Sequence, residues 1–134
     1  MSLFRELMAR PSTLPSSSRW NVLGGCIYLA LGFSTLVWPG SVQAVLSDRP
    51  FVGDEGSLVR VIGMALCVIG WLTLFGARTG ASSMVAASII DRVILVPAVL
   101  VPLALSGVFP HLLMSIAVLD PILAMASYVL WKKK

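Results

Sequence analysis

The stretch LVRVIGMALCVIGWLTLFG, residues 58–76, decides the fold because it is long, apolar and carries only one charged residue, Arg60. A helix needs about 20 mostly apolar residues to cross the roughly 30 Å hydrocarbon core of a membrane. Inside lipid the backbone cannot bond to water, so its N–H and C=O groups must pair within the segment, as they do in a helix. Residues 58–76 are therefore predicted to form a transmembrane helix.

Three further stretches of similar length and character flank this one: residues 21–39, 83–105 and 111–131. They are too long, and alternate too little, to be strands of a membrane barrel. The connections between them are short, which makes successive helices antiparallel neighbours. The predicted fold class is all-α, an integral membrane protein with an up-down bundle of four transmembrane helices over residues 20–134.

The composition agrees with a membrane location. The chain has 134 residues, of which 57% are hydrophobic and 12% charged, and its mean hydropathy is +0.93. Soluble domains are nearer half apolar and a quarter charged. The two cysteines, Cys26 and Cys67, sit in apolar runs without metal-ligand spacing, so they are interpreted as packing residues and no metal site is expected. No cofactor motif is present, and no basic stretch is interleaved with aromatic residues, so neither a cofactor nor nucleic acid is expected.

The distribution of basic residues predicts the orientation. One side of the predicted bundle collects Arg5, Arg10, Arg19, Arg78 and Lys132 to Lys134. The loops of the opposite side contain only Arg49. Because loops rich in Lys and Arg stay in the cytoplasm, we expect a multi-pass protein of the cell membrane, the inner membrane of a bacterium, with both termini cytoplasmic.

Residues 1–19 are predicted to form a cytoplasmic segment with two parts. Apolar residues recur at helical spacing before Pro11, at Leu3, Phe4, Leu7 and Met8. This pattern favours a short interfacial helix lying on the membrane surface, with a frayed tail as the alternative. A linker rich in Pro and Ser follows it.

Charged residues inside the predicted helices are the candidates for function. Asp91, Arg92 and Asp120 lie near the middle of their helices, and Arg60 lies about one turn inside the second. A charge at that depth costs roughly 2.5–3.5 kcal/mol on insertion scales unless it finds a partner or a wet cavity. Depth arithmetic places Arg92 about 19 Å and Asp120 about 15 Å below the outer helix ends, so Arg92 can reach Asp120 on the neighbouring antiparallel helix. Asp91, rotated about 100° from Arg92, should face another helix, such as the second.

Two interpretations of these charges remain open: a balanced network that locks helix packing, or a polar functional site in the bundle core. Arg60 could reach down to the cluster or turn to the outer surface. Ser127 shares an inward face with Asp120, and Tyr28 is the phenol best placed to reach that face. His111, at the outer mouth of the fourth helix, is either an interfacial residue or a proton gate.

Small residues and prolines complete the pattern. The stripe of Gly25, Tyr28 and Gly32 and a matching stripe of Gly63, Cys67 and Gly70 are interpreted as packing grooves. The prolines within the third and fourth stretches, Pro97, Pro102 and Pro121, each remove a backbone donor and predict kinks beside the charges.

Three functions follow as hypotheses. The first is a small membrane protein that binds a lipid-like hydrophobic molecule, a membrane partner or a second copy of itself. Its candidate binding residues are Tyr28, Arg60, Arg92, His111 and Ser127. The second is a membrane enzyme in which Asp91 or Asp120 is the general acid or base on a hydrophobic substrate. The third is a proton- or ion-coupled carrier that acts as an oligomer and uses Asp91, Arg92, Asp120 and His111 as a relay.

Overall fold

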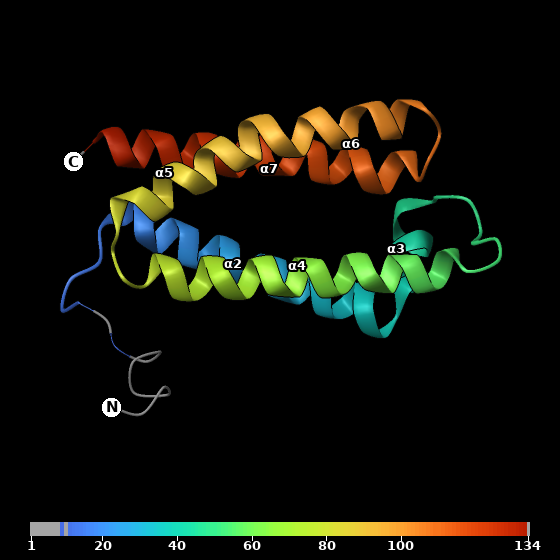
Figure 1. The fold of residues 1–134 in the computed structure, drawn as a ribbon, viewed down its shortest axis with the longest axis horizontal. Helices are drawn as coiled ribbons and strands as arrows, with labels where there is room; N and C mark the ends of the chain where they lie inside the picture. Colours follow the sequence, from blue (N-terminus) through green and yellow to red (C-terminus); the bar gives the residue numbers. More distant parts are fainter. Residues whose placement is uncertain (1–8, 10, 134) are drawn as a thin grey trace.

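The computed structural model of the chain describes residue 9 and residues 11–133, and all regular structure in that part is helical. Four helical segments are long and apolar enough to cross a membrane (Figure 1). The predicted all-α, four-helix membrane fold is therefore confirmed. The elements in chain order are α2 (Ser16–Val37), α3 (Pro39–Leu46), α4 (Glu55–Ala77), α5 (Ser82–Ile90), η1 (Asp91–Leu95), α6 (Val96–Leu105) and α7 (Pro110–Lys132). The interfacial helix predicted near the N-terminus falls almost entirely on residues 1–8 and 10, which lie outside the described part.

The first span begins earlier than the sequence predicts, at Ser16 instead of residue 21. Its first turns include Ser17 and Ser18, which are fully buried. Apolar length detects a span but does not detect polar residues that are buried by packing, such as these two serines. Part of the predicted linker is thus the start of α2.

The first connection contains a helix that the sequence analysis did not predict. Trp38 leaves the helical conformation, with φ −137° and ψ 75°, and α3 begins at Pro39. A residue before proline is disfavoured in the α conformation, and proline is well suited to the first position of a new helix. Pro39 therefore ends one helix and begins the next.

The third span is one continuous helical run over Ser82–Leu105, but its middle is a π-helix, η1. In η1 the N–H of Val96 donates to the carbonyl of Asp91, five residues earlier. Pro97 follows directly and has no N–H to donate, which favours a departure from α-helical bonding at this point. The wider turn changes the direction in which Asp91 and Arg92 point relative to a continuous α-helix.

Helices α2 and α4 pack along most of their length. Their glycines let the two backbones touch: a Cβ added to Gly63 would lie 2.5 Å from the backbone N of Leu36, and one added to Gly32 would lie 2.6 Å from that of Cys67. Gly25 and Gly70 face equally close backbone. The two predicted packing grooves are therefore the two sides of one interface.

The other pair consists of α7 and the α5–η1–α6 run, which lie side by side above α2 and α4 in Figure 1. Helix α2 begins and α7 ends at one end of the bundle, which we call the terminal end; the opposite end is the loop end. Helix α5 contacts both α2 and α4, whereas α6 packs mainly on α7 and η1. The two pairs are therefore close near the terminal end and are less tightly joined towards the loop end.

An apolar cluster closes the loop end. Val59 of α4 packs there with residues of the other pair, namely Ala104, Phe109, Leu112 and Leu113, and α3 adds Val42 and Leu46. Asp48, just after α3, reaches the start of α7, where its carboxylate oxygens accept the N–H groups of His111 at 3.1 Å and Leu112 at 2.8 Å. This satisfies two of the unpaired N–H groups at a helix start and places an anion at the positive end of the helix.

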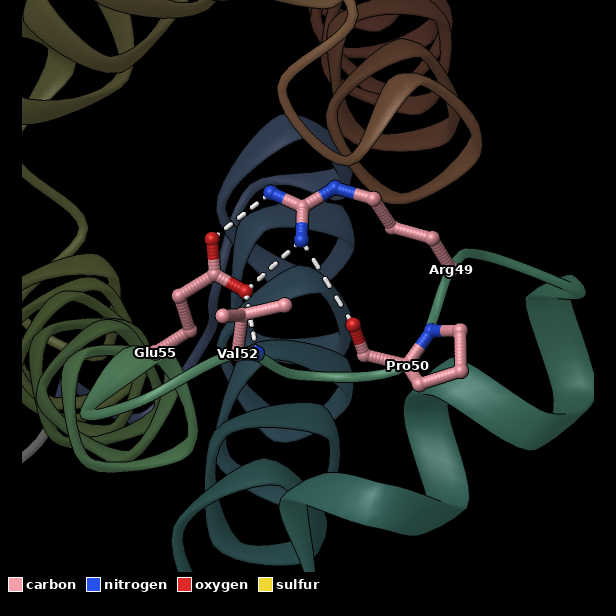
Figure 2. Close-up of polar contacts among 4 residues, drawn as sticks. All are labelled: Arg49, Pro50, Val52 and Glu55. Atoms are coloured by element: carbon pink, nitrogen blue, oxygen red, sulfur yellow. Dashed lines mark hydrogen bonds and ion pairs between the residues drawn. The ribbon is translucent and has the colours of Figure 1, made fainter.

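The loop before α4 is held by an ion pair (Figure 2). The Arg49 guanidinium donates to both carboxylate oxygens of Glu55, at 2.8 and 2.6 Å, and the N–H of Val52 donates to Glu55 Oε2 at 2.8 Å. These hydrogen bonds hold the pKa of Arg49 above its ordinary value. The loop is thereby fixed against the first turn of α4.

Candidate functional site

Three polar side chains from three different elements are buried near the middle of the bundle. They are Tyr28 of α2, Arg92 of η1 and Asp120 of α7, with exposed fractions of 3%, 3% and 4%. Asp120 lies ten residues from the start of its helix and Arg92 ten residues from the start of its span, so each is about 15 Å along the helix axis from an end. The polar centre is therefore far from both membrane surfaces.

Arg92 is held against α2. Its guanidinium carbon lies 4.9 Å from the centroid of the Tyr28 ring, in a cation–π arrangement. A Cβ on Gly24 would lie 3.4 Å from Arg92 Nη1, at ordinary contact distance, so the guanidinium lies directly against this part of α2. The η1 turn and the Tyr28 ring together position the Arg92 side chain.

All three side chains border one cavity of about 360 Å³. Apart from Asp91, its remaining walls are apolar and come from α4 on one side and from η1, α6 and α7 on the other, among them Leu66, Ile69, Leu95 and Val99. Leu95 and Val99 are 60% and 57% exposed. The cavity therefore opens sideways between α4 and α6, toward the hydrocarbon.

A second cavity, of about 410 Å³, lies on the other side of Tyr28 and Asp120. Residues of α2, α3 and α7 line it, including Leu31 and Val45, which are 44% and 81% exposed. Arg92 does not border this second cavity. Tyr28 and Asp120 thus stand between two apolar spaces, and Arg92 faces only the one beside α4.

Several polar atoms of this centre have no hydrogen-bond partner among the described residues. They are Arg92 Nη2, Tyr28 Oη and Asp120 Oδ1, all without solvent exposure. Buried polar atoms are normally paired, because leaving one unpaired costs about 1–3 kcal/mol and more for a charged group. The three residues that carry these atoms border one cavity.

Arg92 and Asp120 lie at a similar depth, but they do not form an ion pair. Among the described residues, the ion pair between Arg or Lys and a carboxylate is Arg49 with Glu55, and the imidazole of His111 contacts Asp48. Arg92 turns to the Tyr28 ring on α2 instead of to α7, because η1 changes its direction relative to a regular helix. Depth arithmetic gave the right level in the membrane but could not include this rotation.

Asp91 and Arg60 do not join the buried group. Asp91 is exposed and borders the cavity that residues of α4 also line. Arg60 is exposed near the loop end and does not line either cavity. The cluster of two Asp and two Arg is therefore only partly assembled.

Ser127 and His111 lie apart from the cavities beside Tyr28 and Asp120. Ser127 is buried nearer the terminal end, where its hydroxyl donates to Asn21 Oδ1 at 3.4 Å. The His111 side chain is 62% exposed at the loop end, with Nδ1 3.1 Å from Asp48 Oδ1. Nine residues along α7, about 13.5 Å, separate His111 from Asp120, so the structure does not bring His111 into a relay with it.

Two buried polar residues, Asp48 and Asn21, are not identified by the sequence pattern. Asp48 lies in a connection 63 residues before His111, and no local pattern marks its contact with α7. Asn21 is 1% exposed, and its amide donates to the carbonyl of Ser17 at 3.3 Å. A polar residue at the start of an apolar run was the available signal for Asn21.

The cavity has apolar walls and a polar floor, which is formed by Tyr28, Arg92 and Asp120. In the described part of the chain, no three His, Cys, Asp or Glu side chains come together as metal ligands. The floor offers a guanidinium donor, a phenol and a carboxyl oxygen, and the walls offer space for hydrocarbon. Comparison with protein-family models, curated proteins and solved structures finds no match to this chain.

Proposed function

We propose that this multi-pass membrane protein binds a lipid-like molecule in the cavity between α4 and α6. The observation that carries the proposal is the combination of unpaired polar atoms on Tyr28, Arg92 and Asp120 with apolar walls that open sideways. Cavities of about 300–1,000 Å³ with a few convergent polar groups are typical of small-molecule sites. A volume of about 360 Å³ falls in that range.

The arrangement of the charges favours binding over a purely structural network. A network that serves only to lock helices would pair Arg92 with Asp120, since pairing lowers the cost of burying both. Close packing in this bundle is achieved by glycines between α2 and α4 instead. The polar centre lies where that packing is absent, beside a cavity.

Copurified lipid tests the proposal. The protein is extracted in mild detergent, its organic extract is examined by mass spectrometry, and the wild type is compared with Ala65→Phe, which places a ring in the cavity. The control is Val68→Phe, a 50% exposed position on α4 that does not line the cavity. We expect one lipid class to be enriched in the wild type and the control and lost in Ala65→Phe. Equal extracts from all three proteins would contradict the proposal.

A second function, a membrane enzyme, is favoured by one observation: Asp91 and Asp120 border the same cavity. A carboxyl group within reach of a bound substrate can act as a general acid or base. Asp120→Asn should then keep the fold and the bound lipid while abolishing its conversion. If the masses of the extracted lipid are the same for wild type and Asp120→Asn, the enzymatic function is excluded.

We also propose that the terminal end faces the cytoplasm. Arg19, Arg78, Lys132 and Lys133 all belong to segments at this end. The loop end carries the ion-paired Arg49. The positive-inside rule then places both termini in the cytoplasm of the cell.

A further inference from the structure

The polar floor of the cavity specifies what a ligand head group must supply. Arg92 Nη2 is a donor that needs an acceptor, and Asp120 Oδ1 is an acceptor that needs a donor. Tyr28 Oη can serve as either. A head group that satisfies this floor must both accept and donate a hydrogen bond within a small space.

We infer that the ligand is a single-chain lipid that ends in an O–H group, either a hydroxyl or a carboxylic acid. This inference rests on the proposed lipid-binding function and defines its ligand. The ligand oxygen accepts hydrogen bonds from Arg92 and Tyr28, and the ligand O–H donates to Asp120 Oδ1. No further group is needed to satisfy the three unpaired atoms.

The route into the cavity excludes larger and permanently charged head groups. Most of the opening is lined by Leu95, Val99 and Ile69, which are exposed and apolar, so a ligand arrives through hydrocarbon near mid-membrane. The exposed Asp91 also borders the cavity. Carrying one charge to that depth costs roughly 2.5–3.5 kcal/mol on insertion scales, and a phosphate head group would bring more polar surface. A hydroxyl or a protonated carboxyl group makes the same passage uncharged.

The position of Arg92 also fixes the direction of the chain. Arg92 borders only the cavity beside α4, whereas Tyr28 and Asp120 border both cavities. A head group bonded to Arg92 therefore leaves its chain in the α4 cavity, along Ile69 and Val99. A volume of about 360 Å³ is near the lower end of small-molecule sites, so we expect one chain, whose far end continues into the surrounding lipid.

Four probes with the same sixteen-carbon chain test the inference: hexadecanol, hexadecanoic acid, its methyl ester and hexadecylamine. Each is titrated into the full chain in detergent micelles, and binding is measured by native mass spectrometry. We expect the alcohol, the acid or both to bind more tightly than the ester and the amine, by roughly ten- to one-hundredfold, because a hydrogen bond to a charged group is worth about 1.5–3 kcal/mol. Preference for the alcohol or for the acid identifies the head group.

Variants of the floor residues test whether these side chains cause the preference for the alcohol or the acid. Arg92→Leu should reduce the affinity for the alcohol or acid by roughly ten- to one-hundredfold, because it removes one hydrogen bond from a charged donor. Arg19→Leu, at an exposed arginine near the start of α2, should leave the affinity unchanged. Tyr28→Phe removes a single oxygen and keeps the ring under Arg92, so it tests the floor even if Arg92→Leu does not fold. Its expected loss is roughly two- to tenfold, that of one neutral hydrogen bond.

The possible results separate the inference from the function on which it rests. If all four probes bind the wild type equally, the cavity binds lipid but the inferred head group is wrong. If the amine binds best, the inference is overturned, because Asp120 would then be the counter-ion of a cation. If none of the four binds, the proposed lipid-binding function itself fails.

Discussion

At the scale of single residues, Arg92 is the side chain whose environment differs most from expectation. Its charge and depth identified it from the sequence as part of a polar centre, together with Tyr28 and Asp120. Its contact with the Tyr28 ring, instead of with Asp120, depends on the π-helical turn η1, which hydrophobic periodicity does not reveal. The sequence therefore predicted the residues and their depth, while their pairing depended on a local change in helix geometry.

A prediction at the same scale concerns the carboxylate of Asp48, which caps α7. Its side chain is 2% exposed and accepts two backbone N–H groups at the start of α7. Asp48→Ala should lower the free energy of unfolding by about 1–2 kcal/mol, as expected for loss of a helix cap. Thermal unfolding in detergent, followed by circular dichroism, measures this effect.

The matched control is His111→Ala. It removes the exposed imidazole but keeps the backbone N–H that Asp48 accepts, so its effect should be much smaller. If His111→Ala is as destabilising as Asp48→Ala, the side-chain pair and not the cap is the stabilising contact.

At the scale of elements, the interface between α2 and α4 was the most predictable part of the packing. Glycines on one stripe of each span indicated a packing groove on each helix, and the structure shows that the two grooves face each other with close backbone contact. Helix α3 was not predictable by the same means, because its eight residues are too few for a span and lie in a connection. The length of an apolar run detects spans, whereas short helices are fixed by local signals such as Pro39.

Gly63 provides a test of this interface. A Cβ at residue 63 would lie 2.5 Å from the backbone N of Leu36, so Gly63→Ala must push α2 and α4 apart. We expect a loss of about 1–3 kcal/mol in the free energy of unfolding, the usual cost of overpacking. Denaturation in mixed micelles with increasing dodecyl sulfate measures it.

Gly56→Ala is the control within the same helix. Its added Cβ would meet only the Phe51 ring, at 3.5 Å, which is ordinary contact. Alanine is the better helix former, so this variant should be neutral or slightly stabilising. Equal destabilisation by both alanines would show that close backbone contact does not hold the pair together.

At the scale of the whole molecule, two helix pairs enclose the cavities between them. Four spans could be predicted from apolar length alone. The space between the pairs could not, because it depends on how α6 and α4 diverge beyond α5, and on the loop-end cluster around Phe109. The polar centre acquires a candidate function only once that space is known.

The orientation of the molecule is tested with single cysteines. In a chain with Cys26 and Cys67 replaced by Ala, we introduce Ser47→Cys at the loop end or Lys133→Cys at the terminal end; both positions are exposed. A membrane-impermeant maleimide added to intact cells should label residue 47 only, and both positions after lysis. Labelling of residue 133 in intact cells would reverse the proposed orientation.

The central claim is that a lipid-like chain occupies the cavity between α4 and α6. The most direct measurement is photo-cross-linking in membranes with a hexadecanoic acid that carries a diazirine on its chain, followed by mapping of the labelled residues. We expect the labels to be concentrated on the cavity residues Ile69, Leu95 and Val99. This labelling should be abolished by Ala65→Phe and unchanged by Val68→Phe. Labels spread evenly over all lipid-facing residues, with no effect of Ala65→Phe, would contradict the claim.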